Sequence, residues 1–185
     1  MINGYKKIFW GMIFTTFHLN LGPIEILPNF IAILIIYSGA KEILANYNSS
    51  SIKIALKLLN IRVYMAFIIF LLTFMGIGIE FNNIILKIVW FNIGNILEIL
   101  SITKLLEGTS EILSENYNTY LGYKYKDKAI KYIYFYSPVL IASNINYIFM
   151  SESVGLVVAV YALIIKIMVI FSFRKLYNGD LQIAK

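Results

Sequence analysis

The sequence predicts an all-α integral membrane protein, a six-helix bundle built from three helical hairpins. Its 185 residues are 59% hydrophobic and only 14% charged, whereas a soluble domain carries about 25% charged residues. Apolar stretches close to or above the roughly 18 residues that cross a bilayer recur along the chain. The Lys and Arg residues fall mainly in the segments between these stretches. These three observations place residues 1–185 in one transmembrane domain.

The first two helices are predicted to form a hairpin with short arms. Gly22, Pro23 and Pro28 interrupt an apolar run over 8–37 that is too long for one ordinary span. Arms of about 16 residues reach about 24 Å, less than the hydrocarbon thickness of about 30 Å. The turn GPIEILP therefore lies below the membrane surface, or the bilayer thins around it. The six predicted spans are approximately 6–21, 27–45, 61–79, 84–106, 130–150 and 154–173.

The distribution of positive charge predicts the orientation of the chain. If the N-terminus is cytoplasmic, all of the 16 Lys and Arg residues except Lys87 and Lys166 fall on the cytoplasmic side, Arg62 among them. Cytoplasmic loops of membrane proteins collect Lys and Arg. We therefore expect three in-out-in hairpins with both termini cytoplasmic, in the cytoplasmic membrane of a bacterium.

The cytoplasmic segments are predicted to lie on the membrane surface. Serines 49–51 can cap a helix that carries Lys53 and Lys57 one turn apart, and this basic face suits anionic lipid. The stretch from Glu107 to Lys128 is predicted to be the longest loop. An interfacial aromatic belt is predicted from the tyrosines of this region, Tyr117, Tyr120, Tyr123, Tyr125, Tyr132, Tyr134 and Tyr136. Basic segments with aromatic residues also suit RNA, but lipid is the better match beside a span. No nucleic-acid partner is expected.

Several kinds of chemistry lack the residues they need. The chain has no Cys, so it has no disulfide, thiolate metal site or Cys nucleophile. It contains no G-x-S-x-G, P-loop, dinucleotide or H-E-x-x-H motif. Asp127 and Asp180, which an intramembrane aspartyl protease would need inside spans, both fall in predicted cytoplasmic segments. We expect neither an enzyme nor a metal or cofactor site.

Two charged residues inside the predicted spans are the strongest candidates for a site. Counted from the outer helix ends, Glu98 lies about 21 Å deep and Lys166 about 18 Å deep, so the two could pair. A charge within a span usually faces the bundle interior and a partner. Glu98 is thus either functional or half of a structural ion pair. Lys166 either pairs with it or extends toward the membrane surface.

Polar residues nearer the outer end extend this candidate site. Asn92, Asn95, Glu98 and Ser101 recur every third residue and form one slowly winding polar stripe that cannot face lipid. If the polar faces converge, they line an outward-facing cavity with Glu98 and Lys166 at its floor; otherwise the amides only join neighbouring helices. The ligand-binding candidates are His18, Asn20, Glu25, Asn29, Asn92, Asn95, Glu98, Asn144 and Lys166.

The segments FWGMIF and ILPNFIAILIIYSGAKEI resemble the N-terminal hairpin of small, uncharacterised multi-pass membrane proteins of Gram-positive bacteria. In that pattern a run similar to ILPDFIGY follows a short first helix. Asn29, Ala32 and Ile33 stand where the pattern has Asp, Gly and Tyr. The resemblance covers about the first 45 residues and implies no activity. The predicted architecture is also similar, more loosely, to the substrate-binding S-components of energy-coupling-factor vitamin transporters.

Two functions fit these observations. The first is a membrane component that binds or moves a small polar solute or ion through the outward-facing cavity. The second is a non-transporting accessory or immunity-type subunit of a larger membrane complex, whose polar stripe only packs its own helices. Gly11 and Thr15, at small-xxx-small spacing, would suit docking to a partner helix. Retention of a small molecule on purification favours the first function, and co-purification with a larger complex favours the second.

Overall fold

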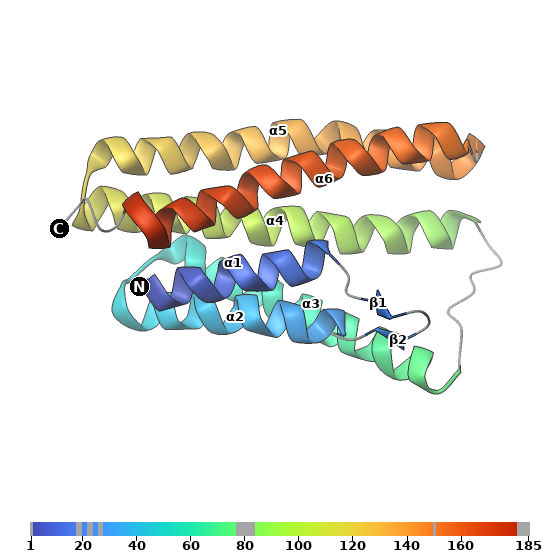
Figure 1. Ribbon diagram of the computed structural model, residues 1–185, viewed down its shortest axis with the longest axis horizontal. Coiled ribbons are helices and arrows are strands. Elements are labelled where there is room, and N and C mark those ends of the chain that lie inside the picture. Colours follow the sequence, from blue (N-terminus) through green and yellow to red (C-terminus); the bar gives the residue numbers. More distant parts are fainter. Residues whose placement is uncertain are drawn as a thin grey trace.

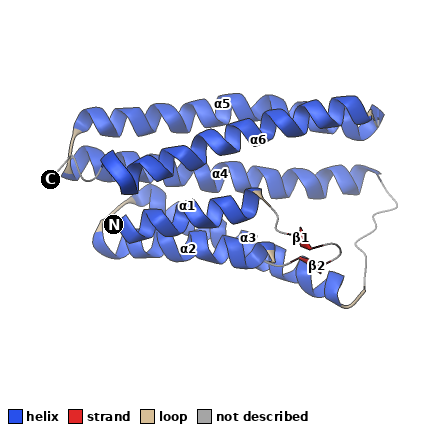
Figure 2. Cartoon of the chain, viewed as in Figure 1, coloured by secondary structure: helices blue, strands red, loops and turns tan. Residues whose placement is uncertain are grey.

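Six α-helices make up nearly all of the computed structural model, which describes residues 2–17, 20–21, 24–25, 28–76, 84–149 and 151–180 (Figures 1 and 2). The helices are α1 (Ile2–Thr16), α2 (Asn29–Asn46), α3 (Ser50–Phe74), α4 (Ile84–Asn116), α5 (Thr119–Phe149) and α6 (Glu152–Lys175). A π-helical turn, η1 (Leu176–Asp180), follows α6. The predicted all-α bundle of six helices is confirmed.

The helices run antiparallel to their neighbours and close into a ring. Each helix packs on the next along the chain, and α6 packs back on α1 (Figure 1). One end of the bundle, called the terminal end here, holds the start of α1 and the end of α6. The opposite end, called the hairpin end, holds the antiparallel pair β1 (Asn20–Leu21) and β2 (Ile24–Glu25).

Among the described residues, three segments are long and apolar enough to cross a membrane. They are Ser50–Phe74, Ile88–Asn116 and Glu152–Asn178. The predicted six-span topology therefore stays a prediction. Helix α1 has 15 residues and α2 has 18, while the first half of α5 carries charged residues between Lys124 and Lys131.

The predicted loop from Glu107 to Lys128 is wrong. Helix α4 continues to Asn116 and α5 begins at Thr119, so that only a short turn separates them. The two extensions pack closely, because the Ser110 hydroxyl donates to the Gly122 carbonyl at 2.7 Å. Apolar side chains of α4 between 105 and 113 are also buried there. Tertiary packing thus extends both helices past their most apolar segments.

The predicted aromatic belt is also wrong for three of its tyrosines. Tyr125, Tyr132 and Tyr136 are buried in the core, with exposed fractions of 0%, 2% and 3%. Spacings of seven and four residues place them on one face of α5, which packs inward. The Tyr125 hydroxyl donates to the Ser172 carbonyl of α6 at 3.0 Å.

Glycine residues bring α1 and α2 into close contact. A Cβ atom at Gly11 would lie 2.5 Å from Ile36 Cγ1 and 2.9 Å from the Ala32 carbonyl oxygen, and one at Gly39 would lie 2.5 Å from the Gly4 carbonyl oxygen. An ion pair of 2.8 Å between Lys7 and Glu42 also links the two helices. The small face of α1 therefore packs on α2, so Gly11 does not serve to dock a partner.

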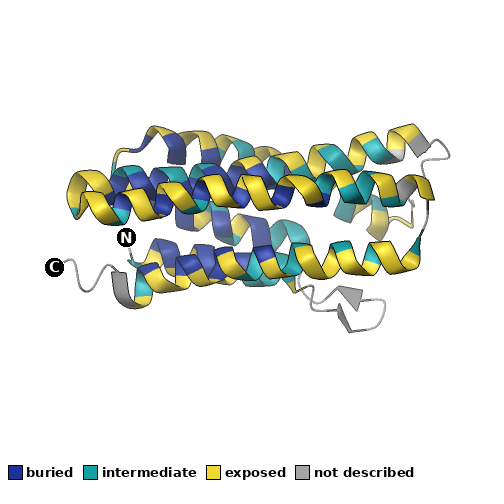
Figure 3. Cartoon of the chain, turned by 90° about the horizontal axis from the view of Figure 1, so that it is seen from above, coloured by how far each residue is buried: buried dark blue, intermediate teal, exposed yellow. Residues whose placement is uncertain are grey.

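The buried core is concentrated toward the terminal end (Figure 3). Tyr5 is fully buried and donates to Thr109 Oγ1 of α4 at 3.1 Å, and its ring stacks on Phe173. Toward the hairpin end, large apolar side chains such as Phe74 (81% exposed) and Phe149 (75% exposed) lie on the surface. Apolar surface of this kind marks contact with another protein or with lipid.

Candidate functional site

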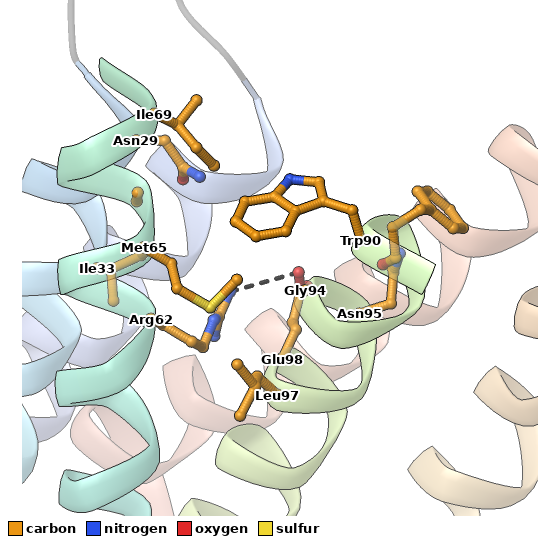
Figure 4. Close-up of a pocket in the computed structure, with 12 residues that line it drawn as sticks. Asn29, Ile33, Arg62, Met65, Ile69, Trp90, Gly94, Asn95, Leu97 and Glu98 are labelled. Carbon is orange, nitrogen blue, oxygen red and sulfur yellow. Dashed lines mark hydrogen bonds and ion pairs between the residues drawn. The ribbon is translucent and has the colours of Figure 1, made fainter. Parts of the chain in front are cut away.

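A cavity of about 290 Å³ lies between α2, α3 and α4 (Figure 4). Its apolar walls include Ile33, Met65, Ile69 and Trp90. Its polar lining residues are Asn29, Arg62, Asn95 and Glu98. Asn29 starts α2 at the hairpin end, whereas Arg62 and Glu98 lie near the middle of α3 and α4. The charged residues therefore form the deep part of the cavity.

Helical spacing explains how α4 builds one wall. Trp90, Gly94 and Glu98 are four residues apart and share a face of the helix. Gly94 has no side chain, and a Cβ atom there would meet no other atom within 4 Å. The cavity therefore continues from Trp90 down to Glu98 along an open strip of α4.

Three charged side chains from three helices meet at the floor of the cavity. Lys166 Nζ of α6 lies 2.6 Å from Glu98 Oε1, and Arg62 Nη2 of α3 lies 3.4 Å from Glu98 Oε2. Arg62 Nη1 also donates to Ser101 Oγ at 3.0 Å. The side chains of Arg62, Glu98 and Lys166 are 9%, 17% and 20% exposed. We call these three residues the charged cluster.

Two tyrosines of α5 border the charged cluster. Tyr136 lies within hydrogen-bonding reach of Lys166. Tyr132, one turn away, lies close enough to Glu98 and Arg62 for their charges to act on it. Its buried hydroxyl has no hydrogen-bond partner among the described residues. The tyrosines thus add hydroxyl groups and no charge to the surroundings of the cluster.

The structure brings four of the predicted candidates to this region. Asn29, Asn95 and Glu98 line the cavity, and the predicted pairing of Glu98 with Lys166 is confirmed by their 2.6 Å contact. Asn95 also donates to the Phe91 carbonyl of its own helix at 2.8 Å.

Asn92 and Asn144 do not join the cavity. Their amides exchange two hydrogen bonds, of 2.9 and 3.1 Å, between α4 and α5. The polar stripe winds as predicted, and nine helical residues turn the direction of the side chain by about 180° net, so its two ends face different helices. Asn92 therefore faces α5, whereas Ser101 meets Arg62 of α3. The expectation that amides of this kind join neighbouring helices holds for this pair.

The remaining candidates lie in the connection between α1 and α2. His18 is outside the described residues. The first span is predicted to continue to residue 21, and this is wrong, because α1 ends at Thr16 and Asn20 pairs with Glu25 across β1 and β2. This strand pairing holds Asn20 and Leu21 in an extended conformation, so the helix ends before them. The side chains of Asn20 and Glu25 are outside the described part of the chain.

Sequence reasoning missed Arg62 and Trp90 as site residues. The charge distribution predicts Arg62 on the cytoplasmic side with the other cations, but its side chain is buried and contacts Glu98. One signal was present: Lys53 and Lys57 lie in the first two turns of α3, whereas Arg62 lies beyond them in a segment that is otherwise almost wholly apolar. A cation in such a segment calls for a partner in the bundle.

The chain matches no family model, no curated protein and no solved structure. In the described part of the chain, no three His, Asp or Glu side chains gather as a metal ion would require. The residues of the cavity and of the charged cluster are therefore the basis for assigning a function.

Proposed function

We propose that this protein is a multi-pass membrane component that binds or moves a small polar solute or ion in the cavity between α2, α3 and α4. The observation that carries this proposal is the position of the charged cluster at the floor of an open cavity. Ionisable residues inside membrane bundles are costly and commonly mark solute or ion pathways. A cluster that served packing alone would need no adjoining space, yet Gly94 keeps the α4 wall open.

The proposal includes a topology of six spans with both termini in the cytoplasm of a bacterium. The hairpin end then faces outward, and Asn29, at the start of α2, is the polar lining residue on that side of the cavity. Exposed lysines of α5 near the terminal end, among them Lys124 and Lys126, would lie beside the inner leaflet. Anionic lipid is the partner that such a basic face suits.

Filling the cavity without disturbing the fold tests this function. Gly94→Leu places a side chain in open space, so the variant should fold and should lose any small molecule that the purified wild-type protein retains. Ala159→Leu, which adds similar bulk on an exposed face of α6, is the matched control and should retain it. Mass spectrometry of the gently extracted proteins measures the retained molecule. Equal retention by the Gly94 variant would contradict the proposal.

The alternative is a non-transporting accessory or immunity-type subunit. The observation in its favour is that Lys166 and Arg62 both contact Glu98, so the cluster links three helices whether or not a solute binds. In that case the wild-type protein purifies with a larger membrane complex and no small molecule. Gly94→Leu then leaves the complex intact, because the cavity serves no purpose in it.

A further inference from the structure

We infer that the solute is a small carboxylate with a short apolar tail, bound through Arg62. This inference rests on the proposed function and specifies its substrate class. Three features of the cavity carry it: an excess of positive charge at the floor, the uneven spacing of the two cations around Glu98, and apolar walls above them.

The charged cluster holds two cations and one anion. Arg62 and Lys166 both contact Glu98, and these are the charged side chains at the cavity floor among the described residues. With all three groups ionised, the cluster carries one net positive charge in a largely buried position. A buried charge without a counter-charge is unfavourable, so a single negative charge on a solute completes the cluster.

The two distances to Glu98 indicate which cation would bind the negative charge of the solute. The Lys166–Glu98 contact of 2.6 Å has the length of a strong charge-assisted hydrogen bond, whereas the Arg62–Glu98 contact of 3.4 Å is longer than such bonds. Glu98 therefore makes its shorter contact with Lys166. Arg62, which lines the cavity, holds Glu98 less closely and has five N–H donors, more than its contacts with Glu98 and Ser101 use. Its planar guanidinium matches a carboxylate in a two-point fork.

The rest of the cavity fits the tail and size of such a solute. Met65, Ile69 and Trp90 offer apolar surface above Arg62, and Figure 4 shows the Trp90 ring extending across the space toward α3. A volume of about 290 Å³ is at the small end of ligand pockets, which span about 300–1,000 Å³. A carboxylate head on Arg62 and a short chain beneath Trp90 would fill both parts.

The chain supplies its own reporter for the test. Its 2 Trp residues are Trp90 in the cavity and Trp10, an exposed residue of α1. Trp10→Phe leaves Trp90 as the sole source of tryptophan fluorescence. The protein in lipid nanodiscs is titrated at pH 7 with butyrate, butanamide and butylammonium. Butyrate and butanamide share their shape and differ in charge, and butylammonium places the opposite charge on a similar chain. Butyrate should change Trp90 emission saturably and bind at least about tenfold more tightly than butanamide, since a hydrogen bond to a charged group corresponds to about that factor.

Variants in the same background separate Arg62 from general charge. Arg62→Met should remove the preference, so that butyrate and butanamide bind alike. Lys57→Met removes an exposed cation from the same helix and should leave the preference unchanged. If Arg62→Met does not fold, Arg62→Lys keeps the charge without the fork and should weaken butyrate binding relative to the wild type. The three-solute comparison on the Trp10→Phe protein decides the inference in either case.

The outcomes distinguish the two levels of the proposal. If none of the three solutes changes Trp90 emission saturably, the carboxylate inference is refuted, whereas the solute cavity itself is refuted only by equal retention in the Gly94→Leu variant. If butanamide or butylammonium binds as tightly as butyrate, the cavity stands and the carboxylate class is wrong. If chloride displaces butyrate at equal concentration, the site takes small inorganic anions and the role of the tail is refuted.

Discussion

Replacing Glu98 should destabilise the bundle more than replacing either of its cationic partners. With an effective dielectric constant of about 20, Coulomb's law gives attractions of about 6 kcal/mol for the 2.6 Å contact and about 5 kcal/mol for the 3.4 Å contact. Desolvation offsets much of each value. Glu98→Gln removes both attractions and leaves two cations close together, whereas Lys166→Met removes one and leaves the Arg62–Glu98 pair.

Breaking a buried ion pair typically costs about 3–5 kcal/mol. We expect a loss of that size for Glu98→Gln. Lys166→Met should cost less, about 1–2 kcal/mol, because removing the lysine leaves the neutral Arg62–Glu98 pair. For a chain of this size, 1 kcal/mol corresponds to about 2–4 °C in Tm. Glu98→Gln should therefore unfold about 10 °C below the wild type when melting in detergent is followed by circular dichroism.

The double replacement provides the strictest comparison. If Glu98 and Lys166 formed an isolated pair, Glu98→Leu with Lys166→Met would be nearly neutral. Because Arg62 also contacts Glu98, the double variant leaves one buried cation and should remain well below wild-type stability. Adding Arg62→Met should recover most of the loss. A double variant as stable as the wild type, or Glu98→Gln no worse than Lys166→Met, would refute the three-member cluster.

Three further predictions concern other parts of the bundle. Gly11→Leu should lower the free energy of unfolding by about 3 kcal/mol or more, because the new side chain meets α2. Gly94→Leu should be neutral or up to about 1 kcal/mol stabilising, since Gly is a poor helix former. Thermal melts of the two variants test this difference. Glu111→Gln should cost about 1–2 kcal/mol, because this carboxylate accepts hydrogen bonds at the start of α3, and Glu115→Gln, an exposed neighbour, should not. Because the chain has no Cys, Tyr120→Cys offers a single thiol; a membrane-impermeant maleimide should label it only after cell lysis, and labelling of intact cells would overturn the proposed topology.

The helices were largely predictable from the sequence because apolar patterning and helix breakers are local signals. The first hairpin is the clearest case: Pro28 precedes α2, which begins at Asn29. The ends of α4 and α5 were not predictable in this way. Hydropathy falls after Lys104, but the packing of Ser110 and Tyr125 onto other helices extends both elements. Contacts between segments that are distant in the sequence cannot be detected from the hydropathy of a short sequence segment.

The candidate site was predictable in part, for the same reason. Glu98 stands out because a carboxylate in an apolar helix needs a partner, and depth along the helices identified Lys166 as that partner. Arg62 did not stand out, because it lies near the lysines of a basic helix start and counting charges by segment grouped them together. Whether a residue belongs to the site depends on the direction in which its side chain leaves the helix. Asn92 shows the same effect, since it has the predicted depth but faces α5.

Closure of the ring by α6 also affects the order in which the charges meet during synthesis. The chain is made from its N-terminal end, so α3 and α4 are present before Lys166 is made. A contact between Arg62 and Glu98 at that stage would be a balanced pair, which is easier to hold away from water than a single charge. The last helix then packs against the first, as the stacking of Tyr5 and Phe173 shows, and Lys166 takes the closer position on Glu98. The unbalanced charge thus enters the bundle only when the final helix is in place.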